Sequence, residues 1–336
     1  MTKMTITENT ENGMNSRILD AVMGVVVGDA LGVPVEFCLR KDRDIKPVDG
    51  MWSYGTFNMP AGTWSDDSSM TIATVDALSR GYDLKRIAEY FVDWYKYTAY
   101  TPWGITFDVG NGTSSALSNY LKEGDVYSCG GSSERENGNG SLMRIIPVCI
   151  YCGVQVLKGL MTNDEAIKII HEVSGITHNH IRSKIGCGLY YFMVLEMLKV
   201  DVDHTFALKE VLQEGLKKGF DYYGAQTYAV DELSHYDRTR NLDVFINTSR
   251  DDIKSSGYVV STFEAAIWCL ITTSSYEEAV LKAVNLGDDT DTVAAVTGGL
   301  AGLYYGIENI PKVWIETIVK RDYIEELCGK FEEAMK

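Results

Sequence analysis

The chain has 336 residues, of which 45% are hydrophobic and only six are proline, which is enough for one large core or two modest ones. Its 47 acidic residues outnumber its 31 basic ones and give a formal net charge of −16, which disfavours partners such as nucleic acid and anionic membrane surfaces. The seven cysteines are an odd number, and only Cys149 and Cys152 have C-x-x-C spacing, without a second such pair. They therefore indicate neither a disulfide framework nor a zinc site.

The first 15 residues are polar, and we expect a flexible N-terminus ahead of a single domain over residues 16–336. The first apolar run, AVMGVVVGDALGVPV, is short, is interrupted by Asp29 and ends at Pro34. These features fit neither a signal peptide nor a membrane span. We therefore expect a cytoplasmic protein, a monomer with no membrane association.

Apolar residues recur at helical spacing along most of the chain, and no segment alternates convincingly as a strand. The predicted helices cover residues 16–31, 66–80, 84–97, 107–122, 141–152, 164–173, 179–199, 205–218, 259–271, 276–285, 290–305 and 321–335. Small residues on nearly every face of AVMGVVVGDALG and TVAAVTGGLAGLYYG are typical of helices buried on all sides. The pattern predicts an all-α, compact multi-helix domain with long irregular stretches at 40–62, 123–140 and 220–257.

Two clusters of hydroxyl and carboxylate side chains, over two hundred residues apart, each precede a buried helix: Ser65, Asp66 and Asp67, and Asp289, Asp291 and Thr292. Each cluster alone is explained by helix capping, because Ser and Asp are favoured N-caps and negative charge suits a first turn. Capping needs only one such residue, and adjacent buried carboxylates repel unless a cation lies between them. Oxygen-only ligands suit Mg²⁺ or Mn²⁺, and two facing triads could hold two ions.

A third acidic element lies in GDALGVPVEF. Asp29 lies near the end of the first predicted helix, and Glu36 follows the break at Pro34. On local sequence alone, the ordinary explanation for Glu36 is a solvated loop carboxylate.

Motifs along nearly the whole chain resemble, in order, those of the ADP-ribosylglycohydrolases, a family that includes the dinitrogenase reductase-activating glycohydrolase and the eukaryotic ADP-ribosylhydrolases. They are GVVVGDALGVPVEF (24–37), GTWSDDSSM (62–70), NGNGSLMRIIPV (137–148), SGITHNH (174–180), SGYVVSTFEAAIWCL (256–270) and NLGDDTDTVAAVTGGLAGLYYG (285–306). The resemblance implies an all-α bundle with two Mg²⁺ or Mn²⁺ ions in a central cleft. It also implies hydrolysis of the bond that joins ADP-ribose to a modified group.

By position, the resemblance makes both clusters metal ligands: Ser65, Asp66, Asp67, Asp289, Asp291 and Thr292. It makes Glu36 the loop glutamate that gates or assists catalysis in some members, so that Glu36 or Asp67 handles the proton. The motifs depart from the family pattern at two positions, since Ser65 stands where many members have Thr and Asp288 stands where Gly is commoner. Asp288 is thus either an outer carboxylate of the site or merely exposed.

The remaining motifs supply candidate ligand contacts: Asn139, Gly140, Ser141, His178, Gly257 and Tyr258. Small residues in NGNGSLMR let backbone N–H groups at a helix start approach a diphosphate, with Asn139 on the ribose. The alternative is an ordinary glycine turn with Ser141 as an N-cap. For Arg144 we expect a buried ion pair rather than a ligand contact.

The resemblance makes His178 a contact to adenosine or ribose, whereas the ordinary explanation is a polar residue at a helix entry. Tyr258 could stack on adenine, since it follows Gly257 at a helix start, although such tyrosines commonly cap a core. Segment 220–252 matches none of the motifs and is where substrate preference could be encoded.

We therefore expect a dimetal hydrolase that cleaves the glycosidic bond between ADP-ribose and a protein side chain or a small conjugate. Such cleavage passes through an oxocarbenium-like state and needs a positioned water and a carboxylate that takes a proton. Two alternatives remain at this point. One is a catalytically inactive relative that binds ADP-ribose or has a structural, crystallin-like role, and the other is metal-dependent phosphohydrolysis at the same acidic cleft.

Overall fold

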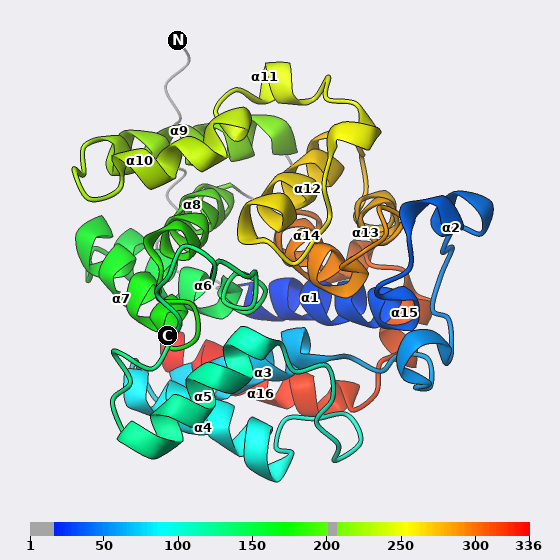
Figure 1. The fold of residues 1–336 in the computed structure, drawn as a ribbon, viewed down its shortest axis with the longest axis horizontal. Helices are drawn as coiled ribbons and strands as arrows, with labels where there is room; N and C mark the ends of the chain where they lie inside the picture. The colour runs from blue at the N-terminus through cyan, green and yellow to red at the C-terminus, as the bar shows by residue number, and fades with distance from the viewer. Residues whose placement is uncertain (1–16, 201–206) are drawn as a thin grey trace.

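A computed structural model describes residues 17–200 and 207–336, so the predicted flexible N-terminus lies outside the described residues. In this part of the chain every named element is helical, and the only β-type pairings are isolated bridges (Figure 1). The α-helices are α1 (Ile18–Gly32), α2 (Arg40–Ile45), α3 (Asp66–Leu78), α4 (Leu84–Tyr97), α5 (Asn111–Glu123), α6 (Ile146–Leu157), α7 (Asn163–Gly175), α8 (Ile181–Met197), α9 (Leu208–Gly224), α10 (Val230–Leu233), α11 (Leu242–Phe245), α12 (Val259–Ile271), α13 (Tyr276–Val284), α14 (Thr290–Tyr305), α15 (Lys312–Thr317) and α16 (Arg321–Met335). The prediction of an all-α fold is confirmed.

Each predicted helix has a counterpart, but α5 and α6 begin four and five residues later than predicted. Helix α5 begins at Asn111 rather than 107, because Asp108 adopts a left-handed φ of 53° just before the N-cap Gly110. Helix α6 begins at Ile146 rather than 141, with a proline in its first turn, where proline fits best. The short helices α2, α10, α11 and α15 were not predicted, because four to six residues carry too little periodicity to reveal a helix.

Helices α1 and α14 lie side by side at the centre of the fold (Figure 1). A Cβ atom on Gly28 would lie 2.2 Å from the carbonyl oxygen of Ala294, and one on Gly32 would lie 2.3 Å from the Cα of Asp291. Only glycine permits such close backbone approach at these two positions. This contact places the end of α1 directly against the first turn of α14.

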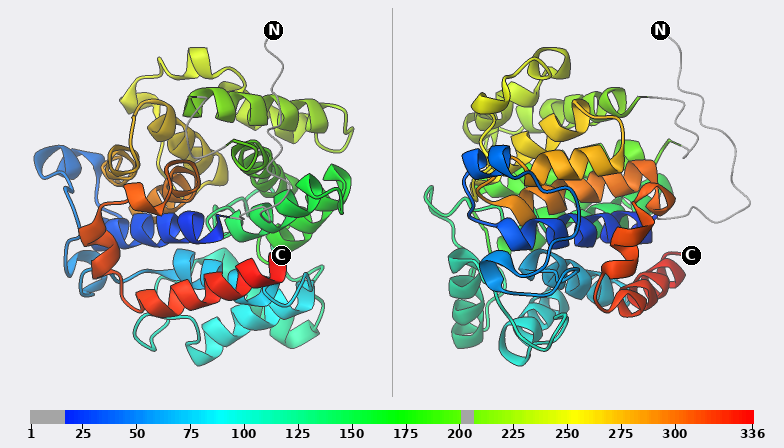
Figure 2. Two further views of the ribbon diagram at one scale, coloured as in Figure 1. Left: turned by 180° about the vertical axis from the view of Figure 1, so that it is seen from behind. Right: turned by 90° about the vertical axis from the view of Figure 1, so that its right-hand side faces the viewer.

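The other helices enclose this central pair. Helices α12 and α13 pack on α14, whereas α3 and α16 pack on α1, and the two layers are seen on either side of α1 in Figure 2. The window Ile18–Val35 is long and apolar enough to span a membrane by length and composition, but 89% of it is buried inside the protein. Its apolar character is therefore explained by its position in the core.

Candidate metal centre and ligand cleft

The two hydroxyl and carboxylate clusters meet where α3 and α14 begin. Ser65 is the N-cap of α3, and its hydroxyl lies 3.2 Å from Oδ2 of Asp67. The hydroxyl of Thr292, in the first turn of α14, donates to the same carboxylate oxygen over 3.2 Å. The structure therefore brings Asp67 and Thr292 into direct contact, as two facing triads require.

Five carboxylates form two overlapping groups at this point. Oxygens of Asp29, Asp67 and Asp291 lie within 4.8 Å of one another, and so do oxygens of Glu36, Asp289 and Asp291. Asp291 belongs to both groups and therefore joins them. The arrangement has the donor set of a site for hard cations.

Burial makes this concentration of negative charge costly. Burial and then the neighbouring carboxylates raise the pKa of both Asp67 and Asp291 well above the usual range. Oδ1 of Asp67, Oδ2 of Asp291 and Oε2 of Glu36 are buried without a hydrogen-bond partner among the described residues. Carboxylate oxygens with no donor facing them, in a cluster of like charge, fit Mg²⁺ or Mn²⁺.

Asp29, which sequence reasoning noted without giving it a role, anchors this cluster. It is fully buried in α1 and accepts hydrogen bonds from the backbone N–H of Ser65 at 2.9 Å and of Ser68 at 3.0 Å. Burial raises the pKa of Asp29 to about 7, although these donors act in the opposite direction. Its side chain therefore fixes the first turn of α3 and adds a carboxylate to the predicted set.

Asp66, a predicted ligand, belongs to neither group. Its buried carboxylate accepts a hydrogen bond from the backbone N–H of Gly110, the N-cap of α5. Burial and then the charge of Asp108 raise its pKa well above the usual range. Asp66 therefore lies at the edge of the cluster, and its ligand role stays a prediction.

Asp108 is the functional candidate that sequence reasoning missed. Its carboxyl group lies within hydrogen-bonding reach of those of Glu36 and Asp291. Burial first, and then the charge of Asp108, raise the pKa of Glu36 to about 10. The sequence FDVGNG, in which two glycines closely follow the aspartate, could have indicated a loop here rather than the predicted helix start.

The loop that carries Glu36 is tied to the start of α14. Glu36 is only 5% exposed, so a solvated loop carboxylate is excluded. The backbone N–H of Phe37 donates to the carbonyl of Asp288 over 2.7 Å, and the N–H of Asp288 donates to the carbonyl of Cys38 over 2.8 Å. The side chain of Asp288 is exposed, so this extra aspartate acts here through its backbone.

Two predicted ligand loops and the loop that carries Asp289 interlock beside the carboxylates. The backbone N–H of Asn139 donates to the carbonyl of Gly257 over 3.0 Å, and that of Asp289 donates to the carbonyl of Ser255 over 3.0 Å. The side-chain amide of Asn139 donates to Asp289 over 2.7 Å. Asn139 and the carbonyl of Ser255 therefore hold Asp289 in position, which is compatible with the predicted contact between Asn139 and a ribose.

His178 lies beneath the glycine loop. Its ring occupies the space that side chains at positions 138 and 140 would need, since a Cβ on Gly140 would lie 2.8 Å from the imidazole. Its Nδ1 shares a hydrogen bond of 2.9 Å with the hydroxyl of Thr177, and burial lowers its pKa to about 3. A neutral imidazole at this place supports the loop that was predicted to contact the ligand.

Ser141 does not have the N-cap role that one expectation gave it. Its buried hydroxyl accepts a hydrogen bond from that of Ser174 over 3.0 Å. Because α6 begins only at Ile146, Ser141 is not its N-cap, and the backbone around Gly140 is not a helix start. These two expectations are therefore wrong, whereas the ligand contact of Ser141 stays a prediction.

The prediction of a buried ion pair for Arg144 is wrong. No carboxylate within the described ranges pairs with Arg144, which donates to the Thr177 hydroxyl over 2.8 Å and to the Val173 carbonyl over 3.3 Å. Its guanidinium also lies 4.4 Å from the ring centroid of Phe91. Arg144 therefore braces the turn that leads to His178.

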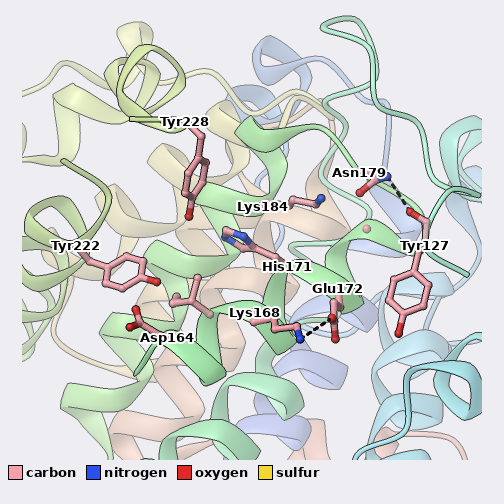
Figure 3. A pocket seen from close by; sticks show the side chains of 11 residues that line it. Tyr127, Asp164, Lys168, His171, Glu172, Asn179, Lys184, Tyr222 and Tyr228 are labelled. Carbon is pink, nitrogen blue, oxygen red and sulfur yellow. Dashed lines mark hydrogen bonds and ion pairs between the residues drawn. The ribbon is translucent and has the colours of Figure 1, made fainter. Parts of the chain in front are cut away.

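Tyr258, the predicted adenine platform, is the N-cap of α12 and is partly exposed. Its hydroxyl accepts a hydrogen bond of 3.2 Å from the guanidinium of Arg182. A separate cavity of about 300 Å³ lies between α7, α8 and α9, and its lining includes His171 and Lys184 (Figure 3). None of the candidate carboxylates lines that cavity.

Comparison with known sequences points to one family. The sequence model described as ADP-ribosylglycohydrolase matches residues 10–336. The ADP-ribosylarginine hydrolase Tri1 of Pseudomonas putida (strain GB-1) is 32% identical over 315 residues, which cover 93% of this chain and 76% of that protein. The ADP-ribosyl-[dinitrogen reductase] glycohydrolase of Rhodospirillum rubrum is 27% identical and is matched over 92% of both chains.

A solved structure shares the fold. It is described as an ADP-ribosylglycohydrolase-related protein complex, and it superposes on this chain with a TM-score of 0.75 at 27% sequence identity. The superposition covers 96% of this chain and 99% of that one.

Proposed function

The chain belongs to the ADP-ribosylglycohydrolase family and is a hydrolase of glycosidic bonds, and we propose that it releases ADP-ribose from arginine side chains with the help of two Mg²⁺ or Mn²⁺ ions. The observation that carries this proposal is the convergence of the α3 and α14 clusters on buried carboxylate oxygens that lack donors. Arginine is favoured as the linked residue because a relative named for that substrate is 32% identical over most of this chain.

The cations would be held by carboxylates that lie in the two groups. Asp67 and Asp29 would serve one ion, Asp289 and Glu36 the other, and Asp291 both. When bound, the ions would supply Lewis-acid chemistry to the ribose and the attacking water. They would also offset the negative charge that otherwise opposes an anionic ligand.

The proton is handled by this chain's own carboxylates. Glu36 has one buried oxygen without a donor, so in its ionised form it can accept a proton from water at that oxygen. Asp67 is the alternative carrier, because its Oδ1 is likewise free of donors. Which of the two acts is decided by the Glu36 variant described in the Discussion.

The remaining polar groups orient the reacting bond. Asn139 fixes the carboxylate of Asp289, and the loop around Gly140 lies against His178 beside it. We place the ADP-ribose along this loop, with the adenine toward Tyr258. The scissile bond then lies between Asp289 and the Glu36–Asp108 pair.

A panel of substrates tests this function. The purified chain is incubated with arginine-linked, serine-linked and O-acetyl-linked ADP-ribose in Mg²⁺ or Mn²⁺, together with the variant Asp289→Asn. We expect release of ADP-ribose from the arginine conjugate, and loss of that release in the variant. An unchanged rate in Asp289→Asn would contradict the role of the cluster, binding without hydrolysis would favour an inactive relative, and release of phosphate would favour a phosphohydrolase.

A further inference from the structure

Three phenylalanine rings form a continuous row beside the candidate metal centre. The ring centroids of Phe37 and Phe57 are 6.3 Å apart, and those of Phe57 and Phe107 are 5.2 Å apart. Phe37 directly follows Glu36, and Phe107 directly precedes Asp108. These three rings, here named the aromatic rim, therefore border the carboxyl groups of Glu36 and Asp108.

Phe37 has a conformation that the fold's core does not require. Its side chain is 63% exposed, and its backbone adopts a left-handed φ of 62°, which is uncommon for a bulky residue. Asp288, whose φ is 66°, holds it there through the hydrogen bonds between the two loops. A strained backbone that presents an apolar ring to solvent beside a reactive site indicates that the ring contacts a ligand.

Further exposed apolar residues lie in the segments that carry Phe57 and Phe107. Tyr54 is 58% exposed and lies near Phe57 in sequence, whereas Trp103 and Ile105, at 48% and 54%, precede Phe107. A single exposed apolar residue is ordinary, but several in the segments that border one candidate site are typical of an interaction surface.

We propose that the aromatic rim docks the polypeptide that carries the ADP-ribosylated arginine, by contact with an apolar residue next to it. This inference rests on the proposed function. The rim borders Glu36 and Asp108, where the scissile bond would lie, so the group attached to the ribose must pass over it. The net charge of −16 favours a carrier segment that is basic as well as apolar.

Two peptides of equal length test the docking, each ADP-ribosylated on one central arginine. One has leucine and lysine beside the arginine, and the other has glycine and glutamate. We expect the chain to hydrolyse the first at least about tenfold more efficiently, mainly through KM, because one good aromatic contact is commonly worth that factor. Fluorescence anisotropy of the same labelled peptides gives their affinities independently of hydrolysis.

Variants of Phe37 test whether its ring causes the preference for the leucine- and lysine-containing peptide. Phe37→Asn removes the ring but tolerates the left-handed backbone, and it should abolish most of the preference, whereas Phe37→Leu should keep part of it. Leu160→Asn, at a residue 72% exposed between α6 and α7, is the matched control and should leave the preference intact. Equal treatment of both peptides by the unmodified chain, or a preference that survives Phe37→Asn, would overturn the inference. Failure to hydrolyse either peptide would count against the proposed function instead, while the affinities would still decide whether the rim docks them.

Discussion

The hydroxyl of Thr292 donates a hydrogen bond to Oδ2 of Asp67 over 3.2 Å, across 225 positions of the chain. This contact joins the first turns of α14 and α3. Both helices pack on α1, where glycines allow the backbone of α14 to approach closely. The carboxylates at the two helix starts therefore form one site rather than two separate caps.

Asp291→Asn should have opposite effects with and without cations. In chelator-treated protein it removes one of several repelling buried carboxylates, so the melting temperature should rise by about 2 °C or more. With Mn²⁺ or Mg²⁺, the variant should lose the stabilisation that the unmodified chain gains from bound ions. Calorimetry with and without the cation measures both effects.

Asp288→Asn is the matched control for that variant. The side chain of Asp288 is exposed, and asparagine also tolerates its φ of 66°. Both the melting temperature and its response to cations should remain as in the unmodified chain. A large loss of cation response would show that Asp288 belongs to the site.

Gly28→Ala should destabilise the protein and reduce hydrolysis. The added Cβ would lie 2.2 Å from the Ala294 carbonyl oxygen, and overpacking of this kind costs about 1–3 kcal/mol in free energy of unfolding. Separating α1 from α14 would also move Asp29 away from Asp291. Denaturant unfolding and the hydrolysis rate check the two effects.

Gly329→Ala provides the contrast for that change. Gly329 lies in α16 with no atom within 4 Å of an added Cβ, so alanine should stabilise the helix by about 0.5–1 kcal/mol. Hydrolysis should be unaffected. Equal destabilisation by both substitutions would contradict the importance of close packing at Gly28.

Glu36→Gln should separate proton transfer from cation binding. If Glu36 takes the proton from water, kcat should fall by about 10²-fold or more. The melting temperature should still rise with Mn²⁺, since Asp29, Asp67, Asp289 and Asp291 remain. A variant with unchanged kcat would leave Asp67 as the proton carrier.

His171 should make stability depend on pH. Its Nε2 shares a hydrogen bond of 2.7 Å with the Tyr223 hydroxyl, and burial lowers its pKa to about 3. Below about pH 6.5 the unfolded chain binds the proton more readily, so the free energy of unfolding should fall by up to about 1.4 kcal/mol per pH unit from this group. His171→Gln should make that slope shallower between pH 6.5 and 4, as measured by denaturant unfolding, and an unchanged slope would contradict the assignment.

Much of the fold and the centre of the site could be predicted from the sequence. Long helices such as α4 and α9 have clear apolar periodicity, and α1 and α14 are recognised by apolar residues on nearly every face. The clusters around Asp67 and Asp291 stand out because capping alone does not need so many carboxylates. The short helices have no such signal. For this reason the stretch 220–257 was predicted to be irregular, although α10 and α11 lie within it.

The parts that could not be predicted depend on tertiary contacts. Asp108 reaches Glu36 only because the segment before α5 is a loop, and Arg144 is satisfied by a hydroxyl, a carbonyl and a ring rather than by a carboxylate. The backbone role of Asp288 likewise arises from its pairing with the Glu36 loop. Local sequence contains none of these partners.

The most direct test is a cation titration of chelator-treated protein, followed by release of ADP-ribose from ADP-ribosylarginine. We predict no release without cation, a rise in rate that saturates near two Mn²⁺ per chain, and no recovery in Asp67→Asn. Full activity in the chelator-treated protein, or full recovery in Asp67→Asn, would contradict a cation centre at the junction of α3 and α14.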